Sequence, residues 1–157
     1  MKFNSALKNF VLVLFSTLLI SACSTAKKAS VDTVDDVYTG TDTVEYLANG
    51  VPDRVFFATN KSSLTTRSRD TLRKQATYLR KNKDLTVTIE GHADERGTRE
   101  YNLALGERRA NAAKDYLMTY GVSGKRISVI SYGKEKPVNP ASSPLAWSQN
   151  RRSVTIK

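Results

Sequence analysis

Apolar residues recur along the chain with two different periods. Four segments have the composition and alternation of β-strands, namely residues 55–57, 85–89, 127–130 and 153–156. In two longer stretches, roughly 64–82 and 98–121, the apolar positions return at helical spacing. The pattern therefore predicts four short strands and two main helices.

The order of these elements is β-α-β-α-β-loop-β. Strands that alternate with helices connect through right-handed crossovers, which requires some parallel pairing. We therefore predict an α+β fold, in which a four-stranded mixed sheet is packed by two main helices. Residues 133–150 hold three prolines and are predicted to form an ordered surface loop, anchored by Trp147 over one end of the core.

A different pattern marks the N-terminus. The apolar run at residues 10–20 follows two lysines and precedes small residues. This run is shorter than the roughly 20 residues that span a bilayer as a helix. Residues 1–22 therefore read as a secretory signal peptide.

The signal ends at the single cysteine of the chain. The sequence Ile20-Ser21-Ala22-Cys23 resembles a bacterial lipobox, whose cysteine is diacylated and becomes the first residue of the mature protein. Acyl chains at Cys23 would hold the protein on a membrane without a spanning helix. The next residue is Ser24 and not Asp, and by resemblance this favours the outer membrane. The alternative is a free or accidental cysteine.

Residues 23–50 differ in composition from the rest of the chain. They are rich in small and polar residues and offer too little apolar surface to offset the entropy of ordering. We predict a lipidated N-terminus and flexible tether here, followed by one domain at residues 51–157. The alternative is a docked arm, because Val31, Val34, Val37 and Tyr38 fall at helical spacing.

The amino-acid composition excludes several kinds of functional site and partner. The chain has 157 residues, a net charge of +10, one Cys and one His, which excludes an internal disulfide and makes a metal centre improbable. No cofactor is expected. The excess of basic residues lies in 51–157. A nucleic-acid partner is not expected, because no binding motif supports it and the export signal opposes it. The basic helix face is expected to be a solvated surface that can assist binding to an anionic polymer.

Charged residues gather where the second strand meets the second helix. Asn102 and Arg109 are seven residues apart, so they share one helical face beside the apolar stripe. An arginine bordering the core needs an anion, and Asp94 at the end of the preceding strand could supply it. The simplest interpretation is an Asp94–Arg109 clamp that fastens strand to helix.

The same residues carry a family resemblance. Residues 91–98 (GHADERGT) and 102–110 (NLALGERRA), with 131–137 and 150–154 after them, are similar to the signature of the OmpA-like peptidoglycan-binding domain family. The resemblance covers about residues 53–157. It implies noncovalent binding of the peptide stem of peptidoglycan through its meso-diaminopimelate residue.

The resemblance also implies roles for single residues. The position of Asp94 accepts hydrogen bonds from the ammonium of the ligand, and the position of Arg109 pairs with a carboxylate. Asn102 corresponds to the polar helix residue of the site, and Arg151 to an arginine at its rim. A zwitterion needs one fixed anion and one fork-shaped cation, and arginine suits a carboxylate because it binds bidentately. Without ligand, Asp94 and Arg109 could satisfy each other.

One loop departs from the family pattern. Where the family carries Phe-Asp-Phe-Asp or a close variant, residues 57–60 read Phe-Ala-Thr-Asn. We expect this loop to act through backbone N–H groups, of which Ala58 still supplies one.

The resulting hypothesis is an outer-membrane lipoprotein that faces the periplasm, binds peptidoglycan and is not an enzyme. For a lipoprotein of this family the resemblance implies partnership with the Tol system, chiefly TolB, in envelope integrity and cell division. A wall-anchoring lipoprotein without a Tol partner is the alternative. A cell-wall hydrolase is the rival class, since His92 or a carboxylate pair drawn from Asp94, Glu95 and Glu100 could be invoked. We disfavour it, because a domain this small has little room for a sugar-binding cleft.

Overall fold

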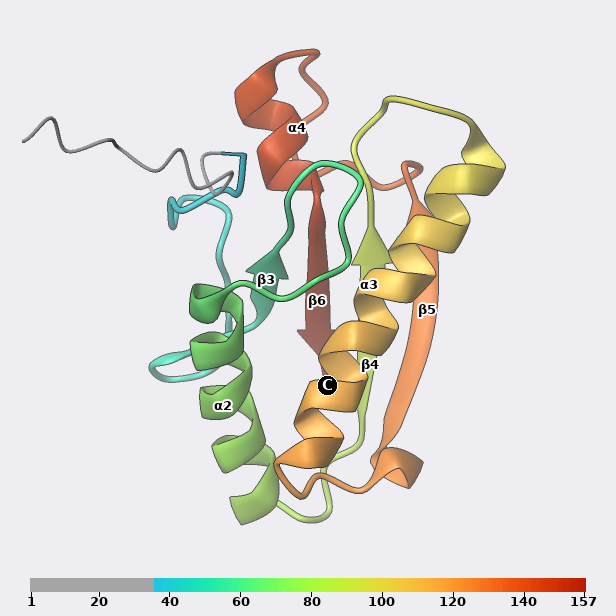
Figure 1. Ribbon diagram of the computed structural model, residues 1–157. Coiled ribbons are helices and arrows are strands. Elements are labelled where there is room, and N and C mark those ends of the chain that lie inside the picture. Colours follow the sequence, from blue (N-terminus) through green and yellow to red (C-terminus); the bar gives the residue numbers. More distant parts are fainter. Residues whose placement is uncertain (1–35) are drawn as a thin grey trace, which may run out of the picture. The chain divides into compact units, whose positions relative to one another are not determined.

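The computed structural model describes residues 36–157, and its centre is a four-stranded sheet of order β3-β6-β4-β5 (Figure 1). The strands are β3 (Arg54–Phe56), β4 (Val87–His92), β5 (Ile127–Gly133) and β6 (Arg152–Ile156). β6 pairs antiparallel with both β3 and β4, whereas β4 and β5 are parallel. The predicted mixed sheet is therefore confirmed.

Two helices cover one face of this sheet (Figure 1). α2 (Thr66–Lys81) and α3 (Arg99–Thr119) each begin after a threonine whose hydroxyl accepts a backbone hydrogen bond in the first turn, which satisfies one otherwise unpaired N–H group. The core between helices and sheet consists of Val55, Phe57, Leu72, Ala76, Leu79, Val87, Ile89, Ala110, Ala113, Leu117, Val122 and Ile127. The two predicted main helices are therefore confirmed.

Two glycines let α3 approach β4 closely. A β-carbon on Gly91 would lie 1.8 Å from the carbonyl oxygen of Gly106, and one on Gly106 would lie 2.4 Å from the hydroxyl of Ser131. Because the atom met by Gly91 belongs to the backbone, G91A must push helix and strand apart. We expect it to lower the free energy of unfolding of residues 24–157 by about 2 kcal/mol, measured by urea denaturation.

The matched control is G124A, in the short helix η1 (Gly124–Arg126). A β-carbon there would lie 3.1 Å from the end of the flexible Met118 side chain, so a change below about 1 kcal/mol is expected. Equal stability losses for the two variants would contradict the close helix–strand contact.

Residues 36–50 form a docked arm and not a flexible tether. Tyr38 is buried, with its ring 4.8 Å from that of Phe56, and Leu47 is buried in β1 (Tyr46–Ala48), which pairs with β2 (Val51–Pro52). The prediction of a flexible tether from composition is wrong for this part, because Tyr38 and Leu47 are buried and Asp42 is hydrogen-bonded to Gln149. Residues 23–35, Cys23 included, and the signal peptide lie outside the described residues.

The proline-rich segment contains a helix, α4 (Pro144–Asn150), where the sequence indicated only a loop. Ser143 caps it and Pro144 occupies its first turn, both of which favour a helix start. Trp147 is partly exposed and lies beside Glu95 and Arg96, and its place over an end of the core stays a prediction. Within residues 36–157, no helix has both the length and the apolar composition to cross a bilayer.

Candidate functional site

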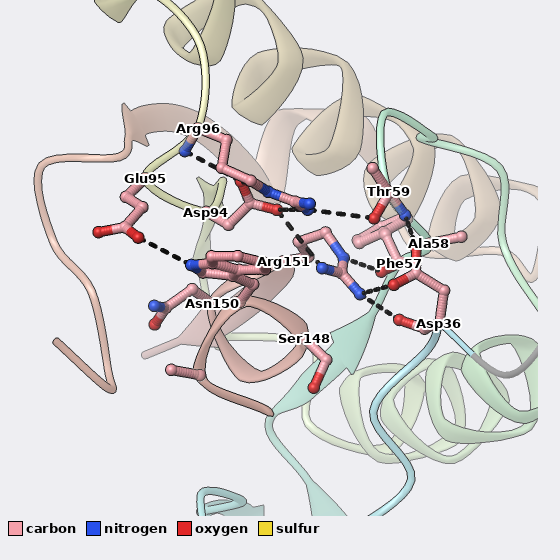
Figure 2. Close-up of polar contacts among 12 residues, drawn as sticks. Asp36, Phe57, Ala58, Thr59, Asp94, Glu95, Arg96, Ser148, Asn150 and Arg151 are labelled. Carbon is pink, nitrogen blue, oxygen red and sulfur yellow. Dashed lines mark hydrogen bonds and ion pairs between the residues drawn. The ribbon is translucent and has the colours of Figure 1, made fainter. Parts of the chain in front are cut away.

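The polar residues singled out by sequence meet at one end of the sheet, where β3 and β4 end and β6 begins. Because β6 runs antiparallel to both neighbours, three connections come together there. They are the loop after β3, the loop between β4 and α3, and the junction of α4 with β6. Figure 2 shows side chains from these connections pointing toward one another.

Asp94 lies at the centre of the site and is only 7% exposed. Its Oδ1 accepts hydrogen bonds from the backbone N–H and the Nε of Arg96, both at 3.1 Å. Its Oδ2 accepts from Arg96 Nη2 at 2.7 Å and from Arg151 Nη1 at 3.4 Å (Figure 2). The carboxylate is therefore held by two guanidinium groups.

Arg109 is fully buried but does not pair with Asp94. Its guanidinium donates to three carbonyl oxygens, those of Lys61 at 2.9 Å, His92 at 2.8 Å and Ala58 at 3.1 Å. Among the residues described, no hydrogen bond or ion pair links it to Asp94. The predicted Asp94–Arg109 clamp is therefore wrong. Arg109 instead fastens the loop after β3 to the end of β4.

Asn102 and Ala58 form hydrogen bonds in the loops of the site, Asn102 to the loop between β4 and α3 and Ala58 within the loop after β3. Asn102 is 2% exposed and donates from Nδ2 to the carbonyl of Arg96 at 2.8 Å, so it and Arg109 do border the core on one helical face. The backbone of Ala58 takes part through its carbonyl, which accepts from Arg109. The backbone N–H that binds a carboxylate in this loop belongs to the next residue, Thr59.

Arg151 was expected at the rim, but its side chain is only 2% exposed. Its Nε donates to the carbonyl of Phe57 at 3.1 Å, and its Nη2 donates to both the carbonyl and the carboxylate of Asp36 (Figure 2). The backbone carbonyl of Arg151 also accepts from the N–H of Phe57 at 2.9 Å. Arg151 therefore joins β6 to the end of β3 and reaches the docked arm.

Sequence reasoning missed four members of this cluster. Arg96 lies with its guanidinium carbon 4.4 Å from the centre of the Trp147 ring, a cation–π contact. The indole Nε1 donates to Glu95 Oε1 at 2.8 Å, and Arg96 Nη2 donates to the hydroxyl of Thr59 at 3.2 Å. The one available signal was the i, i+2 spacing of Asp94 and Arg96, typical of an aspartate that binds its own turn.

The charges of the site are unequal. Three guanidinium groups, those of Arg96, Arg109 and Arg151, lie around Asp94, and within the described residues 51–157 Asp94 is the one carboxylate that pairs with any of them. Burial alone would raise the pKa of Asp94, but the hydrogen bonds and charge of Arg96, with Arg151, hold it below its ordinary value. Burial and the charge of Arg151 lower the pKa of Arg109 to about 10. At neutral pH all of these groups are charged, and the site has an excess of positive charge.

His92 has surroundings that suppress its charge. It is 1% exposed, and burial together with the charges of Arg152 and Lys136 lowers its pKa to about 3. Its Nε2 lies 3.4 Å from Glu90 Oε2, and because the ring is neutral this contact is a hydrogen bond and not an ion pair. The imidazole faces the side of the sheet away from the helices, whereas its backbone carbonyl binds Arg109.

The two-layer fold and this Asp–Arg site define an OmpA-like domain. A model of the OmpA family matches residues 56–151, and the chain belongs to the OmpA family. The chain is 57% identical over 106 residues to the peptidoglycan-associated lipoprotein of Rhizobium meliloti, an alignment that covers 68% of this chain but 60% of that protein. It is 42% identical over 151 residues to the peptidoglycan-associated lipoprotein of Brucella melitensis, with 92% and 89% covered.

Solved structures agree with this assignment. The peptidoglycan-associated lipoprotein of Burkholderia pseudomallei superposes with a TM-score of 0.65 at 38% identity, over 66% of this chain and 88% of that one. The C-terminal domain of Helicobacter pylori MotB superposes with a TM-score of 0.62 at 22% identity, over 66% of this chain and 82% of that one, a likeness of fold alone. The resemblance noted in the sequence is therefore confirmed.

Proposed function

We propose that this protein binds the diaminopimelate-containing peptide stem of peptidoglycan, without catalysis, at the site around Asp94. The observation that carries the proposal is a buried, ionised carboxylate next to guanidinium groups that its own charge does not balance. A free amino-acid centre carries an ammonium and a carboxylate side by side. The arrangement is the complement of such a zwitterion, because Asp94 can accept from the ammonium and the guanidinium groups can donate to the carboxylate.

The hydrogen-bond inventory supports this direction of binding. A guanidinium has five N–H donors. Arg96 uses its Nε and Nη2 on Asp94 and Thr59, and its side chain is 42% exposed, so the donors of its Nη1 remain for a ligand. The loops that carry these groups are fixed from several sides. Asn102 binds the carbonyl of Arg96, and Lys134 Nζ binds the carbonyls of Glu95 and Gly97 at 3.2 and 2.8 Å. Fixed loops lower the entropy lost on binding.

The proposal also includes attachment of the protein to the outer membrane by a lipid. The relatives are named lipoproteins, and Cys23 follows an apolar run and small residues, which supports lipid attachment at Cys23. In this proposal the lipid sits in the outer membrane, the domain faces the periplasm, and the protein ties membrane to wall. Partnership with TolB and the Tol system in envelope integrity and cell division belongs to the same proposal, by family resemblance.

A cell-wall hydrolase is the alternative class of protein. The surroundings of its candidate catalytic groups do not favour it. Asp94 is paired with the cations of Arg96 and Arg151, which keep it ionised, and Glu95 accepts from Trp147 and from the hydroxyl of Ser142 at 3.0 Å. A general acid needs a raised pKa, whereas that of Asp94 is lowered. A neutral His92 with a pKa of about 3 is a poor base at neutral pH.

The test is cosedimentation of residues 24–157 with purified sacculi at physiological salt. Most of the protein is expected in the pellet with diaminopimelate-type sacculi. A free tripeptide that ends in meso-diaminopimelate should release it, whereas the lysine tripeptide, which lacks the second carboxylate, should release far less. The supernatant should contain no muropeptides beyond those of a sacculus-only control.

Two results would contradict the proposal. Equal binding to lysine-type sacculi, or no release by the diaminopimelate tripeptide, would show that the site does not read this residue. Soluble muropeptides that accumulate with time would instead establish a hydrolase.

A further inference from the structure

The docked arm places a carboxylate on the candidate binding site. Asp36 Oδ1 lies 2.5 Å from Arg151 Nη2, and Asp36 Oδ2 accepts the backbone N–H of Thr59 at 2.5 Å. The carbonyl of Asp36 accepts from the same guanidinium group. Figure 2 shows Asp36 entering the cluster from the side opposite Glu95, facing Arg151 and the loop after β3.

Asp36 brings a further negative charge to the guanidinium groups. Arg96 and Arg151 pair with Asp94 of the domain, and Asp36 adds a second carboxylate to Arg151. Partial burial opposes ionisation of this side chain, yet hydrogen bonds from Thr59 and the charges of Arg151 and Arg96 hold its pKa below the ordinary value. The arm therefore presents an ionised carboxylate at neutral pH, the same functional group that a diaminopimelate ligand would bring.

The contacts of the arm allow the Asp36 carboxylate to leave the site while the arm stays on the domain. Tyr38, two residues on, is buried against Phe56, and Asp42 accepts from Gln149 Nε2 at 3.0 Å, so the arm stays on the domain by contacts outside the site. The side chain of Asp36 is itself 45% exposed. It can turn into solvent without breaking the packing of Tyr38, and water then replaces its hydrogen bonds.

We propose that Asp36 is an internal competitor, whose carboxylate occupies Arg151 and the Thr59 N–H and must leave before a ligand carboxylate can bind there. The inference rests on the proposed function. It makes the Asp36 carboxylate and a carboxylate of the bound peptide stem alternatives at one place. Because the arm lies between Cys23 and the domain in the sequence, binding to the wall would then alter the segment that leads to the membrane anchor.

The size of the effect follows from the population of the open site. A ligand that binds only when Asp36 has left sees an affinity reduced by the fraction of molecules that are open. If the Asp36 carboxylate occupies the site in about nine molecules of ten, removing the competing charge tightens binding about tenfold.

The experiment is isothermal titration of residues 24–157 with the free L-Ala–γ-D-Glu–meso-diaminopimelate tripeptide. D36N keeps the shape of the side chain and removes its charge, so it is expected to lower the Kd about fivefold to tenfold. The matched control is E45Q, which removes the same charge from the same arm. The Glu45 carboxylate is 85% exposed and lies 3.6 Å from Arg54, outside the site, so its Kd should stay within about twofold of wild type.

Each outcome decides between the two proposals. Tighter binding by D36N alone, or binding by D36N where wild type shows none, establishes the competitor. If wild type binds and D36N binds equally or more weakly, Asp36 does not compete, and the proposed function still holds. If neither binds the tripeptide or sacculi, the proposed function fails and the competitor falls with it.

Discussion

Replacing Asp94 by asparagine is expected to weaken binding to diaminopimelate-type sacculi by about 100-fold. The change keeps the size of the side chain but removes the carboxylate that is assigned to the ammonium of the ligand. A hydrogen bond to a charged group contributes about 1.5–3 kcal/mol, and 100-fold corresponds to about 2.7 kcal/mol. The variant also leaves the guanidinium groups of Arg96 and Arg151 without their shared carboxylate. The measurement is the dissociation constant from cosedimentation at a series of sacculus concentrations.

The control is D70N on α2, an exposed carboxylate that pairs with Arg73 at 3.1 Å. It makes the same change of charge away from the site, and its affinity should match that of wild type. Circular dichroism of both variants checks that each remains folded. Unchanged binding by a folded D94N protein would remove Asp94 from the site.

Replacing Arg109 by methionine is expected to lower the free energy of unfolding by about 3–5 kcal/mol. The substitution keeps much of the apolar stem but leaves the carbonyls of Ala58, Lys61 and His92 without their donor. An unsatisfied buried acceptor costs about 1–3 kcal/mol, and water can relieve part of this cost at the more exposed Lys61. Urea denaturation of residues 24–157 measures the loss, with a midpoint shift at unchanged slope as the expected form.

The neighbouring residue provides a matched control. Arg108 is exposed on the same helix, with its guanidinium 6.0 Å from the ring of Tyr101, and R108M should change stability by less than about 0.5 kcal/mol. If R109M were as stable as R108M, the three carbonyl contacts would not hold the loop. Because R109M is expected to weaken the fold, loss of wall binding in it does not by itself assign a ligand contact, whereas the same loss in D94N does.

The sequence predicted the frame of this protein well, because its helices and strands follow from local periodicity. The alternation at residues 85–89 and the helical spacing in 98–121 correspond to β4 and α3. Burial of Asn102 and Arg109 also followed from their spacing beside an apolar stripe. Helix α4 was missed because the three prolines of residues 133–150 indicated a loop, although a serine cap and a proline in the first turn allow a helix there.

The spacing of residues in the sequence did not predict which partners the charged side chains bind. The sequence placed Asp94 and Arg109 near one end of the sheet but paired them with each other. In the structure Asp94 binds Arg96, two residues along, and Arg151 at the junction of α4 with β6. Arg109 binds two carbonyls of the loop after β3 and the carbonyl of His92 at the end of β4. A guanidinium donates to any correctly placed oxygen, so its partners depend on how distant segments of the chain converge.

The sequence by itself determined the α+β frame, the family and the residue types of the candidate site. These follow from periodicity and from a motif contained in short, continuous segments. The tertiary structure alone decided that residues 36–50 lie on the domain, that Arg151 is buried, and that Asp36 reaches Arg151 and Thr59. Asp36 and Arg151 are 115 positions apart. A contact at that separation depends on the packing of Tyr38 and the sheet, which local sequence patterns do not predict.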